Sequence, residues 1–227
     1  MNNKLHVPVL AIGVIFAISA SHASNNQVSA PVIDPVIEFY LARVDSAFET
    51  SYIFDRPGGC IFKIKSIYTL TNYRGKVSKS DTAEYELVCK SGIFTLARTI
   101  DSASVAENSS LTKLEIERVW AGGYKYYLFP NDTGAGLFSI GFDNPDPKAK
   151  ERPNGILALD RDSYEIKSLL LNYSKKEGYL GYSESFDFYT KDSILYLKSL
   201  EISSSSSGLF GTTYLKRHIE FYDYKLH

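Results

Sequence analysis

The chain contains few of the residues that form metal sites, disulfide frameworks and reactive centres. It has two cysteines, four histidines, one tryptophan and one methionine in 227 residues. Its one long apolar run lies near the N-terminus and is too short to span a bilayer as a stable helix. The formal charge is −1 and no polybasic stretch is present, so the sequence predicts binding neither to nucleic acid nor to an acidic membrane surface.

Motifs that carry catalysis are missing as well. The chain has no Gly-x-Ser-x-Gly elbow, no phosphate-binding glycine loop and no dinucleotide fingerprint. His218 and His227 have no cysteine near them in the sequence, which is a poor basis for a metal site. Glu115 and Glu117 are a pair of carboxylates of the kind that glycoside hydrolysis uses. Both are expected on the same face of a strand, where they would be exposed to solvent. The sequence therefore predicts no catalytic residue, no metal ligand and no cofactor. If the protein is an enzyme, the sequence does not indicate which residues would carry out the reaction.

The N-terminus has the three parts of a secretory signal peptide. A cationic start ends at Lys4, an apolar stretch runs from Val7 to Ile18, and small residues follow as far as Ala23. We therefore predict a signal peptide over residues 1–23 with cleavage after Ala23. Residues 24–32 are small and polar and are expected to form a flexible leader. The predicted location is the periplasm or the cell exterior.

Aromatic residues are abundant, with 17 tyrosines and 13 phenylalanines. Aromatic side chains favour β-strands, and a buried tyrosine needs a partner for its hydroxyl group. Two interpretations are open at this point. The aromatic residues either fill the core of a strand-rich domain or line a cavity or a binding face.

An amphipathic helix is expected to begin the folded part of the chain. Asp34 can cap it, and Pro35 suits its first turn, where no backbone N–H is needed. Apolar residues then recur every three or four positions on one face: Ile33, Val36, Ile37, Tyr40, Leu41, Val44, Ala47 and Phe48. The helix is expected to end between Phe48 and Ser51 and to pack this face against a sheet.

The next two segments alternate with a period of two and predict an antiparallel hairpin. One register pairs side chains of matching character: Cys60–Cys89, Phe62–Leu87 and Ile64–Tyr85 on one face, Lys63–Glu86 and Lys65–Glu84 on the other. Apolar and charged pairs agree on this register, and a slip of one residue would break both. Because it places the two cysteines opposite each other, we predict a Cys60–Cys89 disulfide, with two buried free thiols as the alternative.

The rest of the chain predicts further strands joined by turns. They are Ile93–Ile100, Leu111–Trp120, Tyr124–Phe129, Leu137–Phe142, Gly155–Leu159, Tyr164–Tyr173, Tyr182–Phe188, Ser193–Ile202 and Thr213–Leu226. A turn at Lys191 and Asp192 would pair Phe188 with Leu195 and Phe186 with Leu197. Residues 203–211 are rich in serine and glycine and are expected to be flexible. The predicted fold class is strand-dominated α+β, with residues 33–227 as one domain whose helix packs on an antiparallel meander curled into a half-barrel.

The second half of the chain carries a pattern of strands and turns that is similar to a known family. The strand at residues 155–160 turns into residues 164–169, and strands at 194–197 and 217–225 follow. Together with the position of the helix, this order resembles the LolA-like periplasmic lipoprotein carriers. The resemblance implies an incomplete barrel around an apolar cavity that shelters acyl chains. The cysteine pair is not a general feature of that family.

We therefore expect an exported soluble protein that binds a lipid, a lipoprotein acyl chain or another apolar ligand without covalent chemistry. The expected ligand-facing residues share one face of the sheet: Phe62, Ile64, Tyr85, Leu87, Phe186, Phe188, Leu195 and Leu197. One alternative is a module whose tyrosine-rich surface binds another envelope protein. A second alternative is a small outer-membrane β-barrel, since strands of about ten residues would suit one. The sequence predicts no oligomeric state.

Overall fold

A computed structural model describes residues 33–102, 113–129, 136–176, 179–208 and 211–227. Residues 32–227 form one compact unit, and the fold is described for this unit alone. The predicted signal peptide and leader lie outside the described residues, so both stay predictions. Within the described ranges, no helix has the length and apolar character needed to cross a bilayer.

Helix α1 spans Pro35–Ser51 and confirms the helix predicted from the sequence. The Asp34 carboxylate accepts a hydrogen bond from the Val36 N–H at 2.8 Å, and Pro35 occupies the first turn. The buried face consists of Ile37, Leu41, Val44 and Phe48. Val36 was predicted on this face but is 49% exposed, because it lies roughly 100° around the helix from Ile37.

Ten strands follow the helix and form one antiparallel sheet. Their bounds are β1 Cys60–Thr71, β2 Val77–Lys90, β3 Ile93–Ser102, β4 Lys125–Leu128, β5 Leu137–Asp143, β6 Asn154–Asp160, β7 Ile166–Lys176, β8 Tyr179–Lys191, β9 Ile194–Gly208 and β10 Gly211–Leu226. Of two short 3-10 helices, η1 (Ile53–Asp55) lies between α1 and β1, and η2 (Val119–Ala121) lies between β3 and β4. The order across the sheet is β3-β2-β1-β10-β9-β8-β7-β6-β5-β4, so two meanders join where β1 pairs with β10.

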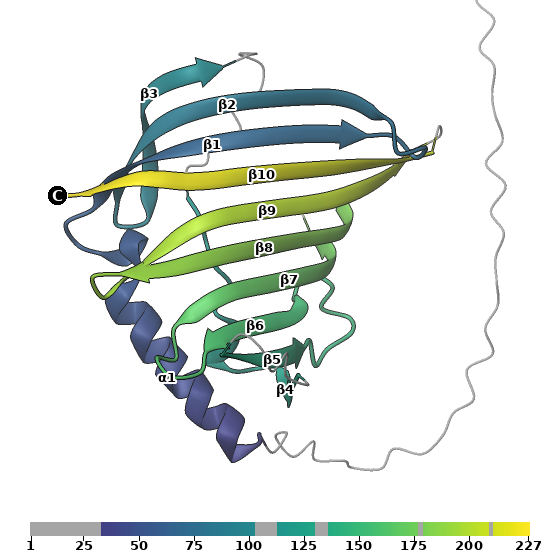
Figure 1. The fold of residues 1–227 in the computed structure, drawn as a ribbon. Helices are drawn as coiled ribbons and strands as arrows, with labels where there is room; N and C mark the ends of the chain where they lie inside the picture. The colour runs from purple at the N-terminus through teal and green to yellow at the C-terminus, as the bar shows by residue number, and fades with distance from the viewer. Residues whose placement is uncertain (1–32, 103–112, 130–135, 177–178, 209–210) are drawn as a thin grey trace, which may run out of the picture. The chain divides into compact units, whose positions relative to one another are not determined.

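The sheet is curled, and α1 lies along one end of its strands (Figure 1). The two edge strands, β3 and β4, do not pair with each other in the described part of the chain. The sheet is therefore open and does not form the closed barrel of the outer-membrane alternative. The predicted fold class, a strand-dominated α+β fold with a helix on a curled antiparallel sheet, is confirmed.

The first hairpin has the predicted register at every pair. Cys60 lies opposite Cys89, Phe62 opposite Leu87, and Ile64 opposite Tyr85, while Lys63–Glu86 and Lys65–Glu84 face the other way. The two cysteines are free, fully buried thiols in this structure, so the predicted Cys60–Cys89 disulfide is not formed in it. Their hydrogen bond to each other, followed by burial, raises the pKa of the Cys60 thiol well above its usual range. The two side chains are therefore in direct contact, as the register predicted.

The second hairpin differs from its predicted register. Phe188 pairs with Leu197 and Leu195 pairs with Thr190, whereas the sequence predicted a Phe188–Leu195 pair. Phe186 pairs with Leu200 rather than with Leu197, since the register shifts again between Asp187 and Phe188. The cause is the turn, which consists of Asp192 and Ser193, both with positive φ (52° and 61°), as a two-residue type I′ hairpin requires. Next to the turn, the observed pairing differs from the predicted one by two residues. Because this number is even, the same side chains of β8 and β9 still point toward the core.

Two other segments also differ from the prediction. Residues 203–207 were expected to be flexible, but they are the end of β9 and pair with residues 212–216 of β10. The neighbouring strand supplies the backbone partners that overcome the weak strand preference of serine. Leu111–Trp120 was predicted as a strand, yet residues 114–118 lie outside the sheet and lead into η2. Leu114 and Ile116 alternate because they pack against the core, and no neighbouring strand pairs with that segment.

Candidate functional site: the two ends of the concave sheet

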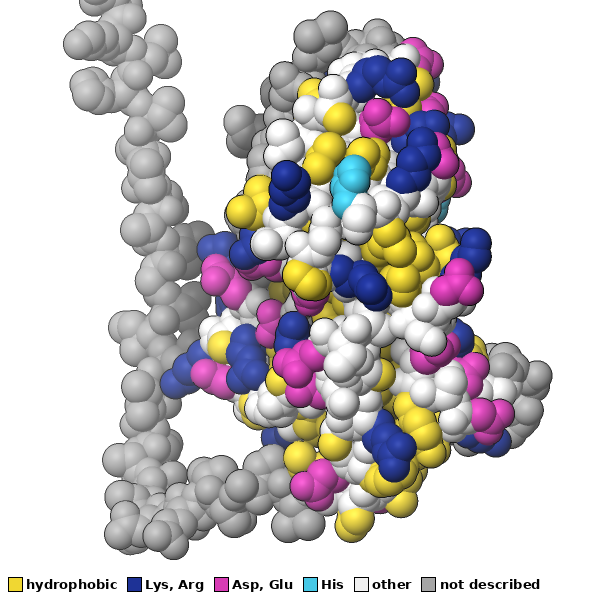
Figure 2. Space-filling view, turned by 90° about the vertical axis from the view of Figure 1, so that its left-hand side faces the viewer, with side chains coloured by type: hydrophobic (Ala, Val, Ile, Leu, Met, Phe, Trp, Pro, Cys, Tyr) yellow, Lys and Arg dark blue, Asp and Glu magenta, His cyan; other side chains and the backbone are white. Residues whose placement is uncertain are grey.

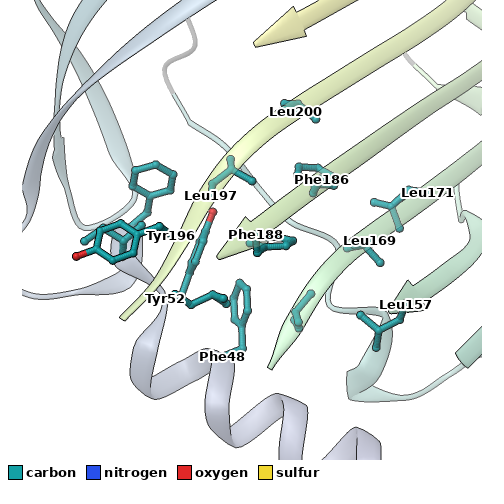
Figure 3. Packing of buried hydrophobic residues seen from close by; sticks show 14 of the residues in the cluster. Phe48, Tyr52, Leu157, Leu169, Leu171, Phe186, Phe188, Tyr196, Leu197 and Leu200 are labelled. Atoms are coloured by element: carbon teal, nitrogen blue, oxygen red, sulfur yellow. The ribbon is translucent and has the colours of Figure 1, made fainter. Parts of the chain in front are cut away.

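One end of the concave face is packed with side chains. In Figure 3, Phe48 and Tyr52 at the end of α1 lie beside Phe188 and Leu197 of the sheet. The rings of Phe48 and Tyr52 stack with centroids 4.4 Å apart. We call this part the filled end, and its buried sheet residues are Phe62, Ile64, Leu87, Leu169, Phe186, Phe188, Leu195, Leu197, Leu200, Ile219 and Phe221.

The filled end is covered by segments that polar contacts hold in place. The Trp120 Nε1–H of η2 donates to the Asp45 carboxylate of α1 at 2.9 Å. Arg118 forms an ion pair with Glu49 of α1 at 2.9 Å and another with Asp55 of η1 at 3.6 Å. The helix, both 3-10 helices and residues 114–118 therefore close this end as one packed layer.

The other end of the same face is hollow. A cavity of about 370 Å³ lies over five neighbouring strands, β2, β1, β10, β9 and β8. Every residue that lines it belongs to one of these strands: Ser66, Tyr68, Lys79, Asp81, Thr82, Ala83, Tyr85, Tyr179, Tyr182, Ile202, Ser204, Leu215 and Arg217. We call this part the open end, because none of the described helices or loops contributes to it.

The walls of this cavity combine apolar surface with charged groups of both signs, Lys79, Arg217 and Asp81. Four tyrosines and the aliphatic side chains of Ile202 and Leu215 supply the apolar part. The Lys79 ammonium lies 5.6 Å from the centre of the Tyr68 ring, and the Arg217 Nε–H donates to the Ser66 hydroxyl at 3.0 Å. Such a lining suits a ligand with an apolar body and a polar group.

A buried polar cluster lies between the two ends. The Glu184 carboxylate accepts hydrogen bonds from the Lys176 ammonium at 2.7 Å, from the Tyr182 hydroxyl at 3.2 Å and from the Tyr173 hydroxyl at 3.4 Å. Burial, and after it the charge of Glu184, raises the pKa of Tyr173 well above its usual range. The Tyr173 phenol therefore stays protonated and continues to donate. The cluster stabilises one charge at the border of the apolar core.

A second hollow, of about 750 Å³, lies where α1, η1 and residues 113–118 meet. Its lining carries charges of both signs: Asp55, Lys113, Glu115, Glu117, Arg118, Glu151 and Lys176. The Tyr124 hydroxyl donates to Glu117 at 2.9 Å, and burial, followed by this contact, raises the pKa of Tyr124 to about 12. Among the described residues, no three His, Cys, Asp or Glu side chains are grouped so as to hold a metal ion.

The predicted ligand-facing residues are divided unequally between the two ends. Tyr85 lines the cavity at the open end. The other seven lie at the filled end, each 6% exposed or less: Phe62, Ile64, Leu87, Phe186, Phe188, Leu195 and Leu197. That any of the eight contacts a ligand stays a prediction.

Most of the residues that line the cavity were missing from the sequence-based set. The alternation that identified Phe62 and Ile64 continues along the same strand to Ser66 and Tyr68, so it could have found these two. Arg217 needed the pairing of β1 with β10, which joins residues about 150 positions apart in the sequence.

Comparison with known proteins identifies similarity of fold alone. No protein-family model matches the chain, and no curated protein sequence is similar to it. A crystal structure of a putative outer membrane lipoprotein-sorting protein domain from Vibrio parahaemolyticus is 11% identical, with a TM-score of 0.45, covering 84% of this chain and 93% of that one. For a DUF1329 family protein from Desulfovibrio piger, the identity is 13%, the TM-score 0.42, and the coverage 84% and 92%.

The complex of MucA and MucB from Pseudomonas aeruginosa is also similar, at 11% identity and a TM-score of 0.26, covering 85% of this chain and 99% of that one. The LolA-like resemblance noted in the sequence thus has a counterpart among solved structures, in the lipoprotein-sorting domain. At these TM-scores we take neither a ligand nor a partner from any of the three proteins. The description of this chain remains one of fold: a helix on an open, curled sheet of ten antiparallel strands.

Proposed function

We propose that the protein is a binding protein without covalent chemistry, which holds a lipid or another amphipathic ligand in the cavity at the open end. The observation that carries this proposal is the unequal filling of one concave face. Aromatic and aliphatic residues are packed on the sheet at the filled end, and the second hollow beside them is lined by charges of both signs. The open end, in contrast, has a cavity of about 370 Å³ over five strands. That volume lies within the range of roughly 300–1,000 Å³ that is usual for small-molecule sites.

The chemistry of the lining indicates how such a ligand would lie. The rings of Tyr85 and Tyr182 and the side chains of Ile202 and Leu215 would contact an acyl chain. Lys79, Asp81 and Arg217 lie on the same lining and would contact a polar or charged headgroup. The apolar surface would supply most of the affinity, and the charges would orient the ligand.

The test uses the protein purified after export from a bacterial host. Native mass spectrometry would show whether a lipid copurifies. Titration of lipid-free protein with the anionic fluorescent probe 1-anilinonaphthalene-8-sulfonate would measure the affinity of the cavity for an apolar ligand. Ile202→Gln places an amide in the cavity wall, and we expect it to weaken probe binding by about tenfold. Ile67→Gln is the matched control, because Ile67 is also half-buried but lies between Ser66 and Tyr68 on β1 and therefore points to the opposite face of the sheet, away from the cavity.

Two results would contradict the proposal: neither lipid nor probe bound to the native protein, or equal weakening in the two variants. The envelope interaction module would then be the better interpretation. Exposed tyrosines available for it are Tyr73, Tyr127, Tyr189 and Tyr214.

A further inference from the structure

The open end finishes in a protruding surface that carries cations and exposed apolar side chains together. Tyr73, Val77 and Tyr214 are 54%, 53% and 51% exposed. Arg74 and Lys76 stand between the first two in the loop that joins β1 to β2, and both are exposed. We call these five residues the tip. Exposed apolar side chains that lie next to one another on a folded domain often mark a contact surface, whereas apolar residues exposed singly need no explanation.

The apolar members of the tip come together from segments far apart in the sequence. Val77 and Tyr214 both pair with Thr71, so they flank it on two neighbouring strands and share its face of the sheet. The Tyr73 ring lies over Gly211, where a Cβ atom would approach it to 2.8 Å. The tip is thus one continuous surface formed by the β1–β2 loop and the start of β10.

The loop at the tip is held in one conformation. The Asn72 side-chain oxygen accepts hydrogen bonds from the Arg74 and Lys76 N–H groups, each at 3.0 Å. The Arg74 Nε–H donates to the Tyr73 hydroxyl at 2.8 Å, with the guanidinium 5.2 Å from the centre of the ring. The aromatic and cationic groups are therefore presented together without a large ordering cost on binding.

Positive charge predominates in the two segments that form the tip and adjoin it. Residues 66–80 and 202–217 contain five Lys or Arg and no Asp or Glu, in a chain whose net charge is −1. Among these cations, Lys216 forms an ion pair with Glu201 at 2.9 Å. The opposite end of the unit, which faces the viewer in Figure 2, carries Lys, Arg, Asp and Glu side chains interspersed. The sequence has no polybasic run, so this positive region exists only because the fold brings two acid-free segments together.

From this arrangement we propose that the tip docks on a bilayer surface that contains anionic phospholipid. Tyrosine is favoured at the boundary between headgroups and acyl chains, and each Lys or Arg near an anionic surface adds attraction that salt weakens. The cavity lies at the same end of the sheet, on the face opposite to Tyr214, since Leu215 of its lining is the next residue along β10. Docking here would bring this end of the cavity close to the lipid. The inference goes beyond ligand binding and rests on the surface residues alone.

The experiment is flotation of the exported protein with vesicles of phosphatidylcholine, or of phosphatidylcholine and phosphatidylglycerol in equal parts. We expect binding to the mixed vesicles, weakened by salt, and little binding to phosphatidylcholine. Arg74→Gln/Lys76→Gln should lower the partition coefficient by roughly 30-fold. Tyr73→Ser/Tyr214→Ser should lower it as well, since these rings lie at the proposed interface. The matched control is Lys148→Gln/Lys150→Gln, which removes two exposed charges from the β5–β6 loop.

The proposal is overturned if the native protein binds neither vesicle, binds both equally, or loses as much in the control as in the tip variants. Probe binding in the cavity is measured on the same samples. No tip residue lines the cavity, so the two proposals can fail separately. A tip variant that loses flotation but still binds the probe has lost only the membrane contact. A variant that loses probe binding but still floats has lost only the ligand site.

Discussion

The two ends of the concave face are formed by the same strands but have different side chains. Along β1, Phe62 and Ile64 are buried at the filled end, whereas Tyr68, a few residues further on the same face, lines the cavity at the open end. Along β9, Leu200 is buried and Ser204 lines the cavity. Fully apolar residues occur where α1, η1 and η2 cover the sheet, and amphipathic residues occur where none of these does. Alternation thus reports which face is inward and does not report whether that face is covered.

The largest expected effect compares packing at the two ends on one strand. Phe62→Ala removes a fully buried ring and should lower the free energy of unfolding by about 4 kcal/mol. Tyr68→Ala at the open end should cost about 1 kcal/mol or less, because the ring borders a cavity already. Urea unfolding of the two variants measures both values. Equal losses would mean that the open end is packed as tightly as the filled end.

The next effect concerns the Cys60–Cys89 pair at the filled end. If the predicted disulfide forms in an oxidising compartment, it would close a loop of about 30 residues and raise the free energy of unfolding by roughly 3 kcal/mol. Unfolding with and without reductant, together with intact mass, measures this effect. Cys89→Ser is the control, since it should show no response to reductant. A native protein that stays reduced after export would support the free thiols seen here.

The sequence predicted the local part of this architecture and missed what depends on distant strands. The β1–β2 register followed from adjacent pairs of matching character, and α1 followed from Asp34, Pro35 and the apolar spacing. The β8–β9 register did not, because the type I′ turn at Asp192 and Ser193 has no glycine to indicate it.

The cavity was harder to predict than the strands. Its lining combines Lys79 of β2, Arg217 of β10 and Tyr182 of β8, which come together only through the pairing of β1 with β10 and the curl of the sheet. The sequence-based set followed apolar alternation, which led to the packed end in all but Tyr85. The tyrosine, serine and arginine residues that alternate onto the inward face could have indicated where this face is left uncovered.

An intermediate effect is expected at the border between the two ends. Lys176→Met leaves the Glu184 carboxylate with its two tyrosine donors alone and should cost about 2 kcal/mol. The loss is below that of a fully buried pair because the Lys176 side chain is 26% exposed. Adding Glu184→Gln should recover most of it, since no buried charge is then left without a counter-ion. A double-mutant cycle in urea measures the coupling, and a double variant less stable than Lys176→Met would contradict this account.

The smallest effect compares two turns of similar geometry, one at each end. Asp160 accepts hydrogen bonds from the N–H groups of Asp162 and Ser163 at 3.1 and 3.0 Å, much as Asn72 does at the tip. Replacing either residue by alanine should cost about 1 kcal/mol at neutral pH, because both turns are exposed. The two accepting side chains differ in charge, since Asp160 is a carboxylate and Asn72 a neutral amide. The hydrogen bonds to Asp160, the Ser163 N–H first, lower the pKa of the Asp160 carboxyl in the folded protein.

A lowered pKa fixes the direction of the pH dependence. The charge of Asp160 stabilises the fold above the unfolded-chain pKa of about 3.9, and this contribution is lost as the pH falls through the lower folded-state value. The cost of Asp160→Ala should therefore shrink between neutral pH and about pH 3, whereas the cost of Asn72→Ala should stay constant. Urea unfolding of the two variants at both pH values measures the difference. A parallel decline in both would mean that acid weakens the whole sheet, and the turn at the filled end would then have no electrostatic advantage over the turn at the tip.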